Sequence, residues 1–330
     1  MIWGKLFSIL FLIAKFSDRS SARVGFHKEI QLSCVSDDFA KAFSTFHIKY
    51  DEQMSTYNYK FYDGEIEAIK GLLGEREKII FFFLGHEDFL QNPSGRNFKA
   101  ARAQLLDTKA TVCIVNYDFI CGPNLIKDLH YFMAIKNRLP AVVDMSASFI
   151  QNIVDSPKLK IKLSTVYLSG FCLGGHVAGN VGHALKKIYK GKEAAAVIWA
   201  FDPPKFGYPY PMEEGKPRRV QKGDAGLVVV FHSSSFCVHD NIADVDVILN
   251  DGISQPGCEN NLIVCRCNHN AAFVLREFII YKSNYLLKTK QNIPYASSKN
   301  GTFVLDFINP STQCKGTYTL KTGKIFGNNS

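Results

Sequence analysis

The sequence of 330 residues contains no block of like charges, no internal repeat and no low-complexity segment. Its formal net charge of +9 is spread along the chain, and the usual nucleic-acid-binding motifs are absent, so we expect no nucleic-acid partner. The positive charge indicates either attraction to anionic lipid surfaces or simply a solvated basic surface. No linker divides the chain, and a hydrophobic content of 46% is sufficient for a large core. We therefore expect a globular protein.

Hydrophobic runs of membrane-spanning length are also missing. The apolar stretch Leu6–Ala14 is much shorter than the roughly 20 residues that a transmembrane helix needs. Lys5 precedes it and small residues at 20–22 follow it, a pattern that predicts a secretory signal peptide over residues 1–22. Basic residues close behind the stretch leave an uncleaved, membrane-proximal anchor as the alternative. We expect residues 23–330 to form one secreted, extracellular domain.

Cysteine, by contrast, is abundant for a chain of this kind. Eight cysteines are enough for four disulfides in an oxidising compartment, and the ninth, Cys172, would then remain a free thiol. Asn300 and Asn328 begin N-glycosylation sequons, which predicts a glycoprotein. The nine cysteines are Cys34, Cys113, Cys121, Cys172, Cys237, Cys258, Cys265, Cys267 and Cys314.

The stretch Ser164–Tyr189 predicts a buried strand that turns directly into a helix. Thr165–Leu168 is β-branched and apolar, whereas the residues after Cys172 have helical periodicity. Glycines two positions before and after Cys172 allow the tight, strained turn of a nucleophile elbow, with a thiol at its tip. The start of the helix would favour the reactive thiolate. A chance pattern around a buried cysteine is the alternative. The apolar helix face comprises Leu173, Val177, Val181, Leu185 and Ile188.

Continuous apolar runs at wide intervals are typical of parallel strands that are buried on both faces and joined by helices. They predict an α/β fold with a mostly parallel central sheet and helices on both faces. We expect strands at Phe46–Lys49, Lys78–Leu84, Thr111–Tyr117, Thr165–Leu168, Ala194–Phe201 and Leu227–Phe231. We expect helices near Gly95–Leu106, Leu139–Asp155, Leu173–Tyr189 and Asn270–Tyr285.

In such sheets, ligands bind beyond the carboxyl ends of the strands, where Cys172 and Asp202 are both expected. Asp202 follows an apolar strand and precedes two prolines, so it can orient an imidazole; a turn or helix-capping aspartate is the alternative. Among nine histidines, His269 follows in the nucleophile–acid–base order of α/β-hydrolases. His232 and His239 are competing candidates.

The segment Gly170–Gly179 (GFCLGGHVAG) is similar to the G-H-S-L-G-A-H-x-x-G elbow of the pancreatic lipase family, which includes arthropod lipases and phospholipases A1. The resemblance covers roughly Phe46 to Ile325. It implies an α/β-hydrolase fold without a carboxy-terminal lipid-binding β-sandwich. Further matches in the family's order are Phe201–Pro204 (L-D-P-A), Asp224–Ser233 (D-A-x-x-V-x-x-I-H-T), Asp244–Gly252 (G-x-x-D-F-x-P-N-G-G), Gln255–Cys258 (Q-P-G-C), Cys267–His269 (C-[SN]-H) and Gly316–Thr322 (G-x-Y-x-L-x-T).

The resemblance implies a catalytic triad of Cys172, Asp202 and His269, and a lipid or phospholipid substrate at a membrane or lipid interface. It also implies that the backbone N–H groups of Leu173 and His86 form the oxyanion hole. His232 would then be a structural histidine. We expect no cofactor and no metal, and a monomeric protein.

Two residues depart from the family pattern. The nucleophile is cysteine where the family has serine, and Phe171 replaces the preceding histidine. Sulfur is larger than oxygen, and a displacement of about 1 Å in an active site can cost ~10²-fold in rate. Cysteine–histidine pairs nevertheless catalyse acyl transfer in other enzymes.

In this family a cysteine-bounded loop before the histidine covers the site, and here it would run from Cys258 to Cys267. So short a loop leaves the cleft open, as in the phospholipase A1 branch. Its apolar residues 262–264 could enter a lipid interface or pack locally. The segment Pro203–Gly223 is not obviously shortened, so the choice between lipase and phospholipase stays open.

These residues leave three hypotheses. The first is a lipase or phospholipase A1-like carboxylic ester hydrolase that acts through Cys172. The second is a catalytically impaired lipid-binding or yolk-protein-like protein with the same fold. The third is a zinc cluster of Cys258, Cys265, Cys267 and His269, which the tight C-x-C spacing and an oxidising compartment disfavour.

Overall fold

The computed structural model describes most of the chain after residue 28. His86, His239, Cys121, Cys314 and the expected signal peptide lie outside the described residues. The described residues are 29–35, 43–49, 63–85, 95–117, 131, 135–136, 139–208, 217–238, 241–259, 264–282, 289–290, 293–311 and 315–324.

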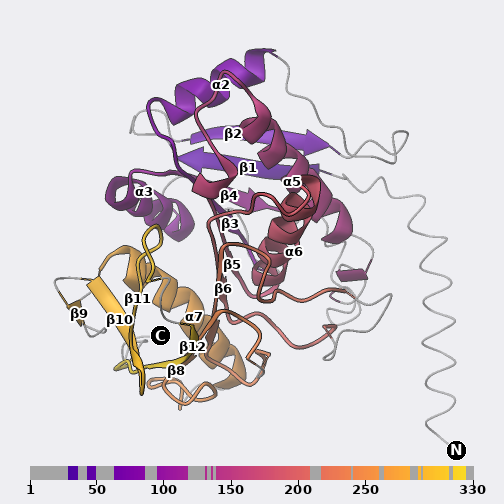
Figure 1. The fold of residues 1–330 in the computed structure, drawn as a ribbon. Helices are drawn as coiled ribbons and strands as arrows, with labels where there is room; N and C mark the ends of the chain where they lie inside the picture. The colour runs from indigo at the N-terminus through magenta and orange to yellow at the C-terminus, as the bar shows by residue number, and fades with distance from the viewer. Residues whose placement is uncertain are drawn as a thin grey trace, which may run out of the picture.

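One large sheet forms the centre of the molecule, as Figure 1 shows. Its strands follow the order β11-β10-β12-β8-β7-β6-β5-β3-β4-β1-β2, and β9 pairs with β10. The seven strands from β12 to β4 run parallel, and antiparallel strands flank them on both sides. The strands are β1 (Glu29–Val35), β2 (Phe43–Lys49), β3 (Ile79–Phe83), β4 (Thr111–Asn116), β5 (Val166–Phe171), β6 (Val197–Phe201), β7 (Leu227–His232), β8 (Val245–Leu249), β9 (Thr289–Lys290), β10 (Ile293–Ser298), β11 (Gly301–Val304) and β12 (Gly316–Leu320).

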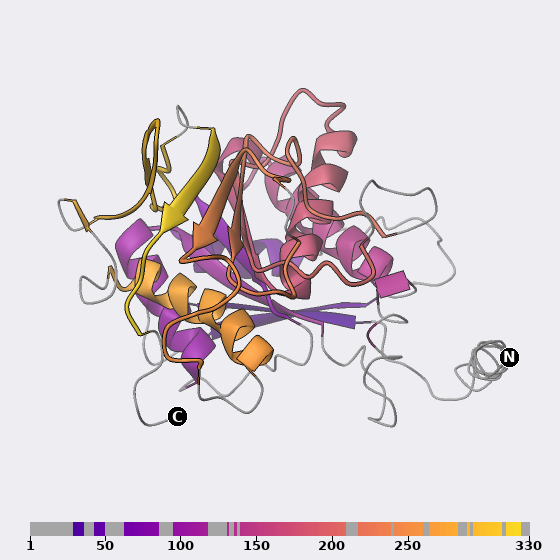
Figure 2. The ribbon, with the colours of Figure 1, turned by 90° about the horizontal axis from the view of Figure 1, so that it is seen from below.

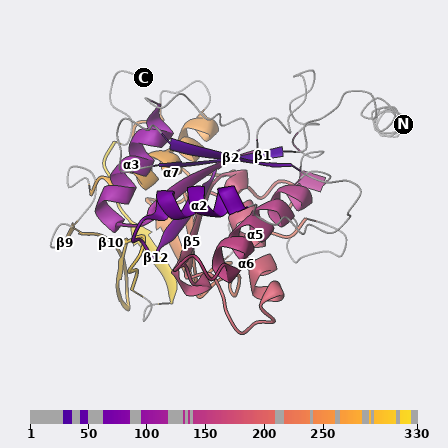
Figure 3. The same ribbon diagram turned by 90° about the horizontal axis from the view of Figure 1, so that it is seen from above.

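Helices cover both faces of this sheet. Helices α5 and α6 lie on one face and α3 and α7 on the other, a division that Figures 1, 2 and 3 show from three directions. Strand β3 explains why both faces must be covered. Ile79, Phe81 and Phe83 point into one core, whereas Ile80 and Phe82 point into the other. The helices are α2 (Asp63–Leu73), α3 (Arg96–Thr108), α5 (Leu139–Asp155), α6 (Leu173–Ile188), α7 (Val264–Ile280) and the short 3₁₀-helix η2 (Leu163–Thr165).

The mostly parallel α/β architecture expected from the sequence is confirmed, with some wrong boundaries. The helix expected at Asn270–Tyr285 is α7, which begins at Val264 and therefore contains His269 within its length. Ile188 does not belong to the buried face of α6, because 39% of it is exposed beside the lysines of the last turn. Strand β1 and the strands from β8 onward were not predicted, because they are short or alternate in polarity.

The expectation that every cysteine except Cys172 forms a disulfide is wrong. Cys34–Cys113 joins β1 to β4, and Cys258–Cys267 closes the loop before His269. Cys237 and Cys265 are free, together with Cys172. Cys237 is completely buried beside the ring of His232 and behaves as a small core residue.

The structure bears on the expected glycosylation site at Asn300 and on the question of membrane-spanning helices. Asn300 is exposed in the turn between β10 and β11, so its sequon is accessible, and its glycosylation stays a prediction. Within the described part of the chain, no helix has both the length and the apolar character that crossing a membrane requires.

Candidate active site

Strand β5 passes into helix α6 through a single residue, Cys172. Its backbone has φ 54° and ψ −128°, in the positive-φ region that residues other than glycine rarely adopt. Gly170 and Gly174 make this turn possible. A Cβ on Gly170 would lie 2.1 Å from the Gly174 carbonyl oxygen, and one on Gly174 would lie 2.2 Å from that of Phe83. The structure therefore has the strand-to-helix elbow that the glycine spacing predicts.

Asp202 lies at the carboxyl end of β6, next to β5 in the sheet, and also has a positive φ of 50°. Its carboxylate is fully buried. Oδ1 accepts hydrogen bonds from the backbone N–H groups of Ser233 and Ser234 at 2.6 and 3.1 Å, and Oδ2 accepts one from the Ser234 hydroxyl. These donors compensate for burying the charge and hold the carboxylate in one orientation.

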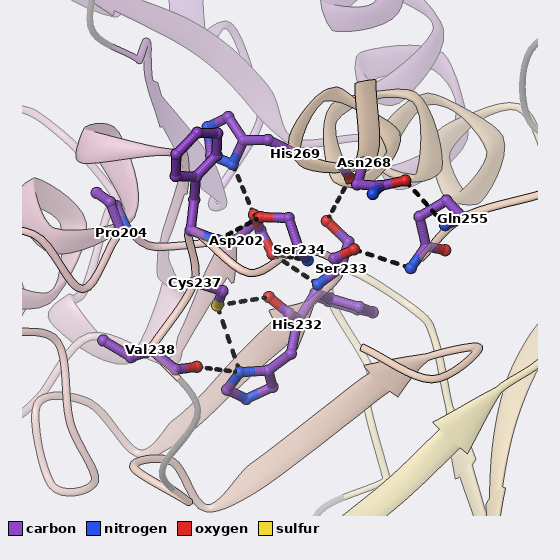
Figure 4. Close-up of polar contacts among 12 residues, drawn as sticks. Asp202, Pro204, His232, Ser233, Ser234, Cys237, Val238, Gln255, Asn268 and His269 are labelled. Carbon is purple, nitrogen blue, oxygen red and sulfur yellow. Dashed lines mark hydrogen bonds and ion pairs between the residues drawn. The ribbon is translucent and has the colours of Figure 1, made fainter. Parts of the chain in front are cut away.

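His269 joins the other two residues from helix α7. Its Nδ1 lies 2.6 Å from Oδ2 of Asp202, and Figure 4 shows the ring turned toward that carboxylate. Because a carboxylate oxygen accepts, Nδ1 donates. Burial disfavours the imidazolium, but the negative charge of Cys172 and the hydrogen bond and charge of Asp202 outweigh it and raise the pKa of His269 to about 10. The structure thus places the imidazole of His269 on the carboxylate of Asp202 and within electrostatic reach of Cys172.

A ring of hydrogen bonds holds the start of α7 against the loop that follows β7 (Figure 4). The Ser233 hydroxyl donates to the Asn268 carbonyl oxygen at 2.9 Å, and Gln255 N–H donates to the Asn268 side-chain oxygen at the same distance. The Gln255 side-chain amide closes the ring by donating to the Ser233 carbonyl oxygen at 2.8 Å. Sequence reasoning missed Ser234 and the role of Ser233, although the Q-P-G-C and C-N-H motifs contain the other two residues.

Aromatic rings surround the imidazole. The Phe171 ring lies 4.8 Å from that of His269 at an angle of 31°, and the Phe236 ring lies 5.9 Å away at 84°. Phe206, which is 46% exposed, packs against Phe236 with the ring centres 5.8 Å apart. No sequence pattern marked Phe206 or Phe236, because neighbours of this kind depend on the course of two separate loops.

Two tyrosines also interact with Cys172. Burial and the negative charge of Cys172 raise the pKa of both Tyr131 and Tyr208. The Tyr131 hydroxyl donates to the Phe206 carbonyl oxygen at 3.1 Å, and Tyr208 stacks on His176 at 3.7 Å. The sulfur therefore has an imidazole and two phenols within electrostatic reach.

The other histidine candidates within the described residues have structural contacts. Both ring nitrogens of His232 are engaged, by Asp246 at 2.8 Å and by the Val238 carbonyl oxygen at 2.7 Å. His176 is buried; one of its ring nitrogens lies 2.7 Å from the Pro204 carbonyl oxygen.

The zinc hypothesis is wrong, because Cys258 and Cys267 form a disulfide and His269 is bonded to Asp202. Over the described ranges, no cluster of three or more His, Cys, Asp or Glu residues could hold a metal ion.

Of the two residues expected to form an oxyanion hole, the structure describes one. Leu173 is the first residue of α6, where backbone N–H groups lack helical partners. His86 lies outside the described residues, although Gly85 before it is described. Cys258 and Cys267, which bound the expected lid loop, form a disulfide with each other, and residues 260–263 of that loop lie outside the described residues.

The chain is similar to several known proteins. Phospholipase A1 2 of Dolichovespula maculata is 28% identical over 59% of this chain and 62% of its own length. Phospholipase A1 of Vespa velutina is 24% identical over the same shares, so the match spans less than two thirds of both relatives. Among solved structures, the α/β hydrolase MGS-M1 from a deep-sea metagenome library aligns with a TM-score of 0.33 and 13% identity, covering 65% of this chain and 74% of that one. The Lipase family profile matches residues 12–285. The chain has an α/β-hydrolase fold and belongs to the Lipase family.

Proposed function

We propose that this protein is a secreted carboxylic ester hydrolase of the lipase or phospholipase A1 type, which cleaves lipid esters with Cys172 as nucleophile. The observation that carries the proposal is a thiol on a strained elbow that interacts with His269, whose ring is hydrogen-bonded to the buried carboxylate of Asp202. This is the arrangement that nucleophilic acyl transfer requires: a nucleophile, a base beside it, and a group that orients the base.

In the first half of the reaction, His269 takes the thiol proton and the sulfur attacks the ester carbonyl carbon. Negative charge then develops on the carbonyl oxygen, and the N–H groups of Leu173 and His86 are proposed to stabilise it. The alcohol leaves with the proton that His269 returns to it, and the acyl group remains on Cys172 as a thioester. In the second half, His269 activates water, the acid is released, and the thiol is restored.

Cys172 occupies the N-cap position of the 16-residue helix α6. The unpaired N–H groups and the positive end of the helix dipole favour the negative charge that develops there during acyl transfer. Asp202 keeps Nδ1 of His269 protonated, so Nε2 is the nitrogen that exchanges protons with the sulfur and the substrate.

A lipid or phospholipid ester is the proposed substrate class. The named relatives are phospholipases A1, and the Lipase family covers most of this chain. The exposed ring of Phe206 packs against Phe236, which in turn contacts His269, so an apolar surface lies close to the site. The chain also carries a net charge of +9, which suits an anionic lipid surface. We propose that the protein acts as a monomer, without a cofactor.

Secretion forms part of this proposal. The two disulfides are typical of proteins that fold in an oxidising compartment. The apolar stretch at residues 6–14 supports a signal peptide.

The decisive experiment compares the wild type with Cys172→Ser and Cys172→Ala, using a short-chain activated ester and a phospholipid. We expect the wild type to hydrolyse the ester, Cys172→Ala to lose the activity, and an alkylating reagent to label Cys172. A wild type without turnover, in which Cys172→Ser creates turnover, would contradict the proposal and favour an impaired protein that binds lipids.

A further inference from the structure

Phe171 is the last residue of β5, and its side chain points to the face of the sheet that α7 covers. There its ring meets two residues of α7 that are one helical turn apart. His269 lies 4.8 Å away at 31°, and Phe273 lies 5.3 Å away at 63°. Because Phe171 is only 5% exposed and contacts both of these α7 side chains, its ring has a fixed position beside the imidazole.

A second phenylalanine also restricts the imidazole. Phe236 meets His269 with an edge-to-face angle of 84° at 5.9 Å. The segment that carries Phe236 is held in place, because Cys237 pairs with Pro204 and the Phe236 carbonyl oxygen accepts the Lys205 N–H at 2.8 Å. The ring of His269 therefore contacts two phenylalanines, one at the end of β5 and one on a fixed loop.

The aromatic face distinguishes the two protonation states of His269. The face of a phenylalanine ring carries negative partial charge, which attracts a cation within about 6 Å of its centre more strongly than it attracts a neutral ring. Phe171 lies within that distance, with its ring tilted by 31° from the plane of the imidazole. Its contribution adds to that of Asp202 without forming a hydrogen bond.

The charged and titratable groups around the pair come from several elements. Cys172 faces His269 from the start of α6 and Asp202 faces it from the end of β6. The Cys237 thiol faces Asp202, and Tyr131 and Tyr208 face Cys172. The guanidinium of Arg96 lies 5.1 Å from the ring of Phe273.

We infer that Phe171 is a positioning residue that stabilises the imidazolium of His269 and thereby favours the thiolate of Cys172 in the resting protein. The inference deepens the proposed function and rests on its thiol–imidazole pair. It gives Phe171, one of the two departures from the family motif, a chemical role that is linked to the other departure, the cysteine beside it.

The test measures how fast iodoacetamide alkylates Cys172 as a function of pH, with the peptide identified by mass spectrometry so that Cys237 and Cys265 do not interfere. Phe171→Leu is expected to move the midpoint of thiolate formation up by about half a pH unit, so that alkylation below the midpoint slows about threefold. Phe81→Leu is the matched control. It removes the same atoms from the opposite core, against Phe149, and should leave the midpoint unchanged.

A second variant separates charge from packing. Pentafluorophenylalanine at position 171 keeps the shape of the ring but reverses its partial charges, so it should raise the midpoint at least as much as Phe171→Leu, even if the leucine variant fails to fold. An unchanged midpoint with the fluorinated ring would overturn the inference. Ester turnover measured in parallel keeps the two proposals apart. A shifted midpoint without wild-type turnover supports the inference while contradicting the hydrolase, and turnover with an unshifted midpoint does the reverse.

Discussion

Within the described residues, the molecule contains two buried histidine–carboxylate pairs at the same end of the sheet, and only in one of them is a ring nitrogen left for a neighbouring thiol. His269–Asp202 and His232–Asp246 have similar separations of 2.6 and 2.8 Å, and each has a free cysteine beside it. In the first pair, one imidazole nitrogen remains for Cys172. In the second, the Val238 carbonyl oxygen occupies the other nitrogen.

The cysteines beside the two pairs, Cys172 and Cys237, differ in their accessibility. Cys172 caps a helix and is partly exposed. Cys237 is completely buried, and burial together with the carboxylates of Asp202 and Asp246 raises its pKa well above the ordinary value of a thiol. In the proposed mechanism the first pair can act because one ring nitrogen is unoccupied and the sulfur beside it is accessible, and the second pair meets neither condition.

The same substitution in both pairs should give opposite results. His269→Gln is expected to lower ester turnover by ~10⁴-fold with little change in stability, because the group that moves the proton is lost. His232→Gln should leave the chemical steps intact but lower the free energy of unfolding by about 3 kcal/mol, because it removes the ion-pair partner of a buried carboxylate. Turnover assays and urea unfolding of both variants make the comparison. A folded His269→Gln protein with normal turnover would refute it.

Removing one or the other disulfide should likewise have different effects on stability and on turnover. Loop-closure entropy predicts that removing Cys34–Cys113, with a sequence separation of 79, costs about 4 kcal/mol, and removing Cys258–Cys267, with a separation of 9, costs about 2–3 kcal/mol. Only the second lies beside His269, so the Cys258→Ser/Cys267→Ser double variant should also lower turnover in the folded protein. Unfolding curves and kinetics at a temperature where both variants are folded would test this order.

The catalytic pair should make stability depend on pH in a defined window. The pKa of His269 is raised from 6.5 to about 10, so the imidazolium stabilises the folded state fully below pH 6.5 and loses this effect as the pH rises through 10. We expect the free energy of unfolding to decline between these values in the wild type. The decline should be smaller in Cys172→Ala, where the negative partner is missing. Equal slopes in the two proteins would show that the pairing does not contribute.

The smallest expected effect concerns the second serine after β7. Ser234→Ala removes the hydroxyl that donates to Oδ2 of Asp202, the oxygen that also holds His269. Two backbone donors remain on Oδ1, so we expect kcat to fall only about threefold to tenfold, with KM unchanged. Ser254→Ala, on an exposed turn, is the control. A loss equal to that of His269→Gln would mean that the hydroxyl, rather than the backbone, orients the carboxylate.

Much of the parallel sheet and of the elbow follows from the sequence, because their signals are local. The run Ile79–Phe83 is apolar without interruption since both of its faces are covered, and Gly170 and Gly174 identify the turn since no other residue fits there. Strands such as β12, which alternates exposed and buried positions, gave a weaker signal.

The parts of the site that were missed arise from contacts between distant segments. Ser234, Phe236 and the ring of hydrogen bonds through Gln255 become meaningful only when the loop after β7 lies beside the start of α7. The expectation of eight disulfide-bonded cysteines failed for the same reason, because burial beside His232, and not the number of thiols, decides the state of Cys237.

The elbow's shape is set by its neighbours and not by the atom at its tip. Gly170 and Gly174 let the chain pass within contact distance of itself, and neither contact involves the side chain at position 172. One nucleotide change that exchanges sulfur for oxygen there would therefore leave the turn intact. Evolution can explore different reactivities on this scaffold without first rebuilding it.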